Sequence, residues 1–374
     1  MMKKVFAICF AALLGLTRLN AQPLSENVRP WNQGQLTWND FSRQSAHAGM
    51  RSELKYFLAY DTERRKINDT TFSRIIAKVY VDRDSSWADP SSMNPWELRY
   101  EQVVFDILEN RCRDLQPDVD RCRKSAEMDS CLQKGFDQAA ENIRLFQTAS
   151  RYGQDTAIIV QWEDRIRQAL DRPDCRDEIP DCSRALFGMG ADLGFGSNLY
   201  VGNFSSRFLP KANVNLGFEM ALGRSELLLG ATLGSCKVKT DSFFVNKERW
   251  SKEDHLEFCQ LNVAYGFRIV DRKTWQLMPF VGYGLTEIST IAGQNDEVKH
   301  RERTNGFLGG LCVDYRLRTS LNIAPNYFRA KECTGVFLRA KIYVAQADFS
   351  EELQGMTVNF SLGIRVFDQF VKLN

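Results

Sequence analysis

The stretch that decides the fold of the second half of this chain is MTVNFSLGIRV, residues 356–366. Apolar side chains occupy every second position from Met356 to Val366, and polar or small side chains, including Arg365, occupy the positions between them. In an extended strand each kind of side chain therefore lies on its own face. A segment of about ten residues with this alternation has the length that a tilted strand needs to cross a membrane. The stretch predicts one strand of an outer-membrane β-barrel.

Seven further segments of residues 184–374 repeat this period of two. The clear repeats are 212–222, 260–269 and 307–317, and the weaker ones are 186–194, 227–234, 276–286 and 336–344. Together they give eight strands, an even number, as a bacterial barrel requires. Residues 321–328 are a candidate for a further strand, and a barrel of ten strands is the alternative.

The connections between these segments alternate in length. Residues 223–225 and 270–273 form short turns, whereas long polar loops lie near 195–210, 236–255 and 287–305. Outer-membrane barrels have this rhythm, with the short turns on the periplasmic side. Residues 318–334 break it, because a long connection stands where a short turn is expected. A soluble β-sandwich also alternates, but the rhythm of the loops favours the barrel.

The polar faces of the predicted strands carry charges of both signs. The acidic residues are Asp192, Glu219 and Asp314, and the basic ones are Arg268, Arg316, Arg339, Lys341 and Arg365. The interior of an eight-stranded barrel is just wide enough for side chains to fill it. We expect these charges to pair across the lumen and close it. A narrow polar pore is the alternative in a wider barrel.

Residues 22–183 have a different, mixed pattern. Strands are predicted at 54–60 and 75–81, with a short strand from Gln35. After Pro95 the pattern becomes helical, and helices are predicted over about 98–115, 128–149 and 157–170. Pro173 and Pro180 then end the helical pattern and mark a linker. The first half is therefore predicted to be an α+β domain.

The beginning of the chain predicts export. Lys3 and Lys4 precede an apolar run from Val5 to Leu16, and residues 1–21 fit a secretory signal peptide cleaved after Ala21. The remainder has 46 basic and 47 acidic residues, a net charge of −1. Nothing in this balance suggests a nucleic-acid partner, and none is expected. The predicted domains are a signal peptide at 1–21, a periplasmic α+β domain at 22–183 and an outer-membrane barrel at 184–374.

Export also permits disulfides, and nine cysteines remain after Cys9. Five of them lie between residues 112 and 182, an odd number that leaves at least one thiol unpaired within that group. Cys175 and Cys182 flank the turn-rich hexapeptide Arg-Asp-Glu-Ile-Pro-Asp and are the predicted disulfide.

The segment RYEQVVFD, residues 99–106, follows the pattern of a zinc-protease helix with its metal ligands replaced. In His-Glu-x-x-His the two histidines bind zinc and the glutamate is the general base. Here Glu101 stands in the glutamate position, and Tyr100 and Val104 stand in the histidine positions. Valine cannot bind a metal, so the usual zinc site cannot form.

Three patches together carry a family resemblance. They are LTWNDF at 36–41, the segment at 99–106, and YGQDT at 152–156 followed by Gln161-Trp162. With them, residues 30–170 resemble a secreted bacterial zinc-protease family (domain of unknown function 922). The resemblance implies a third histidine position, which Ile158 fills. It therefore implies a protease-like fold with a vestigial Glu101, no catalytic residue, no bound metal and no cofactor. The second half is similar to small outer-membrane barrels of Bacteroidetes-type bacteria.

We therefore expect a barrel in outer-membrane lipid that carries a catalytically inactive domain in the periplasm. The expected function is binding or scaffolding of a periplasmic protein or peptide, and no enzyme activity is expected. One alternative is an envelope hydrolase that uses an atypical site around Glu101. Another is a small porin or adhesin that acts through its outer loops. The three histidines, His47, His255 and His300, are not at ligand spacing from one another.

Overall fold

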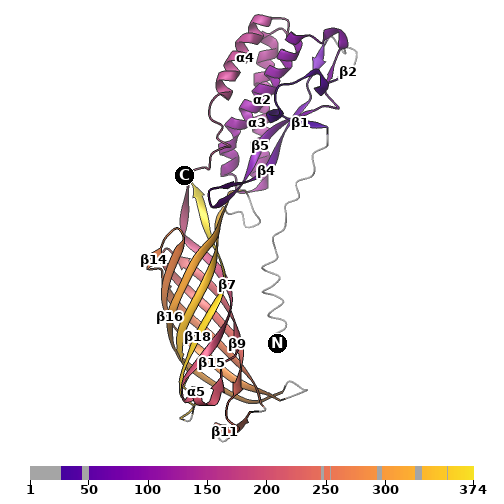
Figure 1. Ribbon diagram of the computed structural model, residues 1–374. Helices are drawn as coiled ribbons and strands as arrows, with labels where there is room; N and C mark the ends of the chain where they lie inside the picture. The colour runs from indigo at the N-terminus through magenta and orange to yellow at the C-terminus, as the bar shows by residue number, and fades with distance from the viewer. Residues whose placement is uncertain are drawn as a thin grey trace. The chain divides into compact units, whose positions relative to one another are not determined.

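The computed structural model describes residues 27–43, 50–245, 248–252, 254–292, 297–324, 331–351 and 353–374 (Figure 1). The predicted signal peptide and His47 lie outside these ranges. The chain divides into two compact units, one with the residues up to Glu63 and Arg74–Ile179, the other with Arg64–Ser73 and Pro180–Asn374. The division thus falls at Ile179/Pro180, slightly before the predicted 183/184. The second unit also takes in ten residues of the first half, 64–73.

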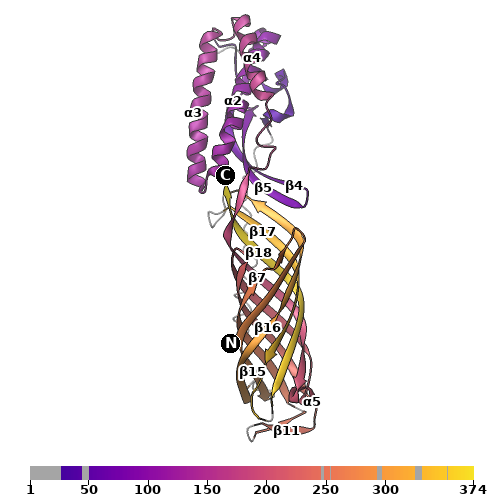
Figure 2. The same cartoon turned by 90° about the vertical axis from the view of Figure 1, so that its left-hand side faces the viewer.

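Three helices lie in the first unit, which we also call the helical unit, close to where the sequence predicts them. They are α2 (Pro95–Arg121), α3 (Ser125–Ala149) and α4 (Thr156–Leu170), and α2 packs against both others (Figure 2). The Asn94 side chain accepts hydrogen bonds from the backbone N–H groups of Trp96 and Glu97 and so caps α2. Asp155 caps α4 in the same way. The helix α2 continues through Pro117, past its predicted end.

Strands complete the first unit. The long strands β4 (Tyr56–Ile67) and β5 (Thr70–Asp82) pair with each other, and β1 (Val28–Pro30) pairs with β5. A second sheet has β2 (Ser42–Arg43), β6 (Trp87–Ala88) and β3 (Ser52–Glu53). The short 3₁₀ helices are η1 (Trp31–Gln33), η2 (Trp38–Asp40) and η3 (Pro90–Ser92).

The strand predicted from Gln35 is wrong. Thr37 and Asp40 instead form a capping box that opens η2, with the Asp40 carboxylate accepting from the Thr37 N–H at 2.8 Å. Arg29 and Arg83 pair with the same carboxylate. The local hydrogen bonds of Asp40 therefore override the β-propensity of the segment.

No helix in the described parts of the chain has both the length and the apolar composition to cross a membrane.

The second unit is built on a closed ring of eight antiparallel strands, as the sequence predicts. In ring order they are β7 (Cys182–Gly202), β9 (Ala212–Leu222), β10 (Ser225–Val238), β13 (His255–Phe267), β15 (Trp275–Ala292), β16 (Glu297–Asn322), β17 (Glu332–Gln346) and β18 (Gly355–Leu373). Pairing of β15 with β16 and of β18 with β7 leaves the ring without an open edge. Residues 321 and 322 end β16 instead of starting a ninth strand, and residues 325–328 lie outside the described ranges.

Two glycines show what the ring requires locally. Gly223 has φ +64° in the turn between β9 and β10, a conformation that side chains other than glycine rarely adopt. Gly217 lies opposite Asp192 in the β7–β9 ladder, and a Cβ on it would fall 1.7 Å from an Asp192 carboxylate oxygen. The missing side chain at Gly217 therefore makes room for Asp192 inside the ring.

The polarity of the ring is the reverse of that of a soluble fold. In β18, the Phe360 side chain is 51% exposed whereas Asn359 beside it is 1% exposed. Every strand of the ring has exposed large apolar residues, such as Phe195, Phe218, Leu229, Val263, Val281, Phe307, Ile342 and Leu362. The apolar face therefore points out and the polar face points in.

The long connections at one end of the ring differ from the polar loops that the sequence predicts. They contain α5 (Asn203–Arg207), β8 (Phe208–Leu209) and the hairpin of β11 (Ser242–Val245) with β12 (Glu248–Ser251) (Figure 1). Their aromatic residues, among them Phe204, Phe208, Phe243 and Trp250, are buried in one cluster. We call this cluster the aromatic cap. It also includes Tyr200, Leu256 and Ile288 of the ring strands, so it packs on the loop end of the ring.

The predicted disulfide between Cys175 and Cys182 is not formed. Both residues have free thiols, and the Cys175 thiol donates to the Arg113 carbonyl oxygen at 3.4 Å. Cys182 instead begins β7, where it pairs with Leu373. Cys122 and Cys131 approach each other, with a distance of 3.6 Å between their sulfur atoms.

We therefore predict that oxidation links Cys122 to Cys131. After incubation of the folded protein with oxidised glutathione, non-reducing peptide mapping should find this pair joined and Cys175 and Cys182 unjoined. The link closes a short loop and should stabilise the helical unit by about 2–3 kcal/mol. A peptide that joins Cys175 to Cys182 would contradict this pairing.

Candidate functional site

The glutamate of the protease-like motif lies on the buried face of α2. Glu101 and Glu97 are one helical turn apart, and they are 3% and 4% exposed. Both carboxylates accept a hydrogen bond from the Ser52 hydroxyl of β3, at 2.6 Å for Glu101 and 2.9 Å for Glu97. Arg51 lies 3.9 Å from Glu97. A serine and two carboxylates thus meet between α2 and the small sheet.

The electrostatics of this group favour a retained proton. Burial, together with the charge of Glu97, raises the pKa of Glu101 to about 7 against the opposing effect of the Ser52 hydrogen bond. Burial also raises the pKa of Glu97. The Ser52 hydroxyl has one proton and two carboxylates as acceptors, so it cannot fully satisfy both. This group can hold and release a proton near neutral pH.

Aromatic and aliphatic side chains that pack within the unit occupy the positions where the family pattern has zinc ligands. The Tyr100 ring stacks on Phe146, with 5.2 Å between ring centroids, and lies against Gly153, whose φ is +85°. Val104 is buried in the core of the unit. Ile158 is half-buried, whereas Ile159 and Ile166 of α4 enter the core. Within the described ranges, no three His, Cys, Asp or Glu side chains are grouped to hold a metal.

Two residues of this group were not found from the sequence. Glu97 could have been predicted from the sequence, since it precedes Glu101 by four residues and so shares its helix face. Ser52 could not have been predicted, because it reaches Glu101 from a strand 49 positions earlier in the chain.

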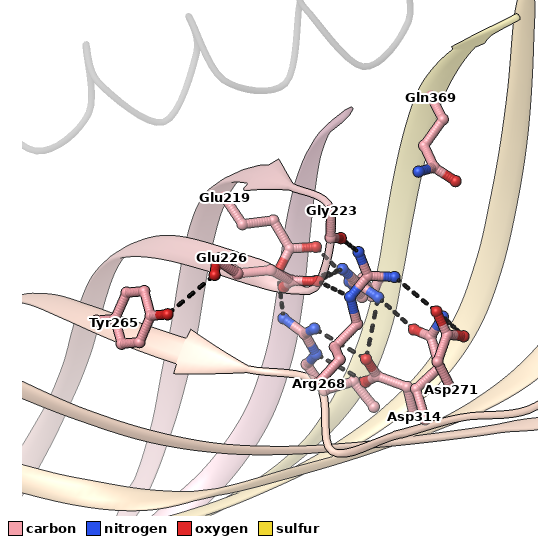
Figure 3. Close-up of polar contacts among 12 residues, drawn as sticks. Glu219, Gly223, Glu226, Tyr265, Arg268, Asp271, Asp314 and Gln369 are labelled. Carbon is pink, nitrogen blue, oxygen red and sulfur yellow. Dashed lines mark hydrogen bonds and ion pairs between the residues drawn. The ribbon is translucent and has the colours of Figure 1, made fainter. Parts of the chain in front are cut away.

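The second site lies inside the ring and centres on Arg365, which has no exposed surface. Its guanidinium donates to Asp314 at 3.1 Å, to Glu226 at 3.2 Å and to Gln276 at 2.8 Å, and it also pairs with Glu219. Figure 3 labels Glu219, Glu226 and Asp314 among these partners. The ring of Phe367 lies 4.4 Å from the guanidinium carbon. One arginine from β18 thus binds side chains of four other strands.

Two further arginines extend these contacts. Arg339 pairs with Asp314 at 2.8 Å, with Glu219 at 3.0 Å and with Asp192 at 3.7 Å. Arg268 pairs with Glu226 at 2.9 Å and with Asp271 at 3.1 Å. We call the connected set the lumen network, and its members are Asp192, Glu219, Glu226, Arg268, Asp271, Gln276, Asp314, Arg339 and Arg365. It fills the width of the ring with paired charges.

The remaining predicted lumen charges are placed differently. The Lys341 ammonium lies 5.3 Å from the centre of the Phe280 ring, and the Arg316 guanidinium lies 5.2 Å from that of Phe337. Neither has an ion pair with another described residue.

Three network members were missed from the sequence. Glu226 precedes the predicted start of its strand, Asp271 lies in a predicted turn, and Gln276 has no charge.

We predict that the buried glutamate makes the helical unit less stable as pH rises. Below pH about 4.5, the ordinary pKa, Glu101 is protonated in both the folded and the unfolded chain. Above pH about 7 the folded chain must bury its charge. The free energy of unfolding should therefore fall across this interval by up to about 3 kcal/mol. Glu101→Gln should reduce the fall, measured by urea unfolding followed by helical circular dichroism.

The exposed residue Glu141, which pairs with Arg144 on α3, supplies the control. Glu141→Gln should leave the pH dependence as in the wild type. An equal pH dependence in Glu101→Gln and wild type would show that Glu101 does not titrate in this interval.

A second prediction concerns the lumen network. Arg365→Leu should lower the free energy of unfolding of the barrel by about 3–5 kcal/mol, since it leaves buried carboxylates without their partner. Leu362→Ile, on the outer face of the same strand, should cost less than about 1.5 kcal/mol. Urea unfolding in lipid vesicles, followed by tryptophan fluorescence, compares the two. Equal stabilities would mean that the network does not hold the ring together.

Comparisons with known proteins found no matching family model and no matching curated protein. The resemblance of residues 30–170 to the zinc-protease family therefore rests on its three sequence patches. Among solved structures, Neisserial surface protein A is 13% identical, with 49% of this chain and 98% of that chain covered and a TM-score of 0.33. Ail of Yersinia pestis in complex with sucrose octasulfate is 10% identical, with 50% of this chain and 99% of that chain covered and a TM-score of 0.26. The outer membrane protein OprG of Pseudomonas aeruginosa is 11% identical, with 51% of this chain and 98% of that chain covered and a TM-score of 0.24. Likenesses at these TM-scores add nothing to the ring that the strand pairing defines.

Proposed function

We propose that this chain is a bacterial outer-membrane protein with a closed barrel as its anchor and a non-catalytic binding unit in the periplasm. The observation that carries the proposal is the reversed polarity of the ring. Large apolar side chains are exposed on all eight strands, while polar and charged side chains are buried inside. A soluble protein rarely exposes so much contiguous apolar surface, whereas a transmembrane barrel needs it.

The contents of the ring support an anchor instead of a pore. The lumen network crosses the interior with paired charges, and the aromatic cap packs on the loop end. A continuous water path through the ring would have to break these contacts. The proposed barrel therefore conducts ions poorly, which argues against the porin alternative.

The orientation follows from the connections of the ring. The short turn at Gly223 and Arg224 lies at the end where β7 begins and β18 finishes, and the Gly223 N–H donates to the Leu186 carbonyl oxygen of β7. Short turns of outer-membrane barrels face the periplasm. The chain that precedes Cys182 would then emerge on that side, which supports a periplasmic first unit.

The first unit is proposed to bind a periplasmic protein or peptide without cleaving it. Tyr100 and Val104 are packed into the core, so these zinc-ligand positions serve the fold. Glu101 is enclosed and hydrogen-bonded to Ser52 in the place where a protease would need a solvent-accessible base. A hydrolase with an atypical site around Glu101 is the rival. Stoichiometric zinc in the purified protein would favour that rival.

An adhesin is the second candidate function, and the aromatic cap favours it. Outer loops of a purely anchoring barrel need no core of their own, yet here α5 and the β11–β12 hairpin share one. A rigid outer surface suits recognition of a partner. Deletion of residues 242–251, tested for loss of cell attachment with the barrel still inserted, separates this function from an anchor.

We predict that a charge on the outer face of the ring opposes membrane insertion. Leu362 lies near the middle of β18, and Leu362→Arg should cost about 2–4 kcal/mol in lipid. Phe244→Arg is the matched control, since Phe244 is exposed on the β11–β12 hairpin outside the ring. Both variants are compared by their folding yield and their unfolding in phosphatidylcholine vesicles. The conductance of the wild-type protein is measured in the same vesicles.

Equal folding of Leu362→Arg and Phe244→Arg in vesicles would count against the membrane location. Large, steady channels from the wild-type protein would count against the filled anchor and favour a porin.

A further inference from the structure

A cavity of about 270 Å³ opens inside the ring at the short-turn end, next to the lumen network. Its charged and amide lining comprises Arg184, Arg224, Arg268, Asp271, Gln276, Arg316 and Gln369. Figure 3 shows Arg268, Asp271 and Gln369 at this end of the network. We call this space the basic vestibule.

The vestibule has an excess of positive charge. It has four arginines and one acidic residue, and that residue, Asp271, already accepts from Arg268 and from the Gln276 amide. Arg184, Arg224 and Arg316 have no ion pair with any described residue. The Nε atom of Arg316 is buried and has no hydrogen-bond partner in the described structure. Guanidinium groups held together in a partly enclosed space repel one another unless an anion joins them.

We propose that the basic vestibule binds one small soluble dianion of the phosphate class, such as inorganic phosphate or a small phosphomonoester. Arginine is suited to this ligand because its planar fork donates two parallel hydrogen bonds to phosphate oxygens. Three unpaired arginines match more than one negative charge, so a monocarboxylate would leave most of their charge uncompensated. The Thr319 hydroxyl and the Gln369 amide supply further donors.

The position of the vestibule selects a soluble anion over a lipid headgroup. Its walls are the inner faces of the closed ring, so the strands separate it from the apolar outer surface. A phospholipid would have to place its acyl chains among the paired charges of the lumen network. The ligand would therefore enter from the water at the short-turn end. This inference is independent of the function proposed for the helical unit.

Titration of the full-length protein with inorganic phosphate, in micelles of an uncharged detergent, tests the proposal. Isothermal calorimetry should show saturable binding of one phosphate per chain, weakened by added salt. Arg316→Gln should weaken the binding by at least about tenfold, because it removes charge-assisted hydrogen bonds. Arg303→Gln is the matched control and should bind as the wild type does. Arg303 is on the same strand, but it is exposed and pairs with Glu287.

A second variant protects the test against misfolding of Arg316→Gln. Arg184 is exposed at the start of β7, so Arg184→Gln should fold normally and still weaken phosphate binding. No saturable binding to the wild type, or unchanged binding in both variants, would overturn the proposal. A third arm adds phosphatidylglycerol to the micelles. Unchanged phosphate affinity supports a soluble ligand, and competition by this lipid would overturn that assignment in favour of a headgroup.

Discussion

A guanidinium group without any contact to solvent is the constraint on which the barrel depends. Burying the Arg365 charge is costly unless carboxylates surround it, so Glu219, Glu226 and Asp314 have to converge on one point. These partners come from β9, β10 and β16. A slip of one residue in any of these strands would turn its carboxylate to the outer face. The ion pairs of Arg365 therefore fix the register of strands that are far apart in the sequence.

The two units bury opposite kinds of side chain, although one chain encodes both. The helical unit buries apolar residues such as Val103, Phe105 and Leu108 of α2. The ring buries Asn359, Arg339 and Arg365, and it exposes Phe360 and Leu362. The same alternation of apolar and polar residues would also fit a soluble sheet. The distinction lies in which face the closed ring turns inward, and here most of the inward side chains are polar.

Sequence reasoning succeeded where the pattern is local and periodic. The alternation in residues 356–366 predicted β18, and the helical spacing after Pro95 predicted α2, because one face of each element is buried throughout. It failed where contacts join distant segments. The meeting of Ser52 with Glu101 and the approach of Cys122 to Cys131 depend on how helices and strands pack, which no local period records. At Gln35 the failure was avoidable, since Thr37 and Asp40 already have the spacing of a capping box.

The pairing of β18 with β7 has a consequence for how the protein is made. These two strands are the last and the first of the ring, so the ring cannot close while β18 is still missing. Until then β17 and β7 each present an open edge, and open edges pair readily with other chains. Joining them also brings together segments of large sequence separation, which is slow. The unfinished ring is therefore open to pairing with other chains until β18 is in place.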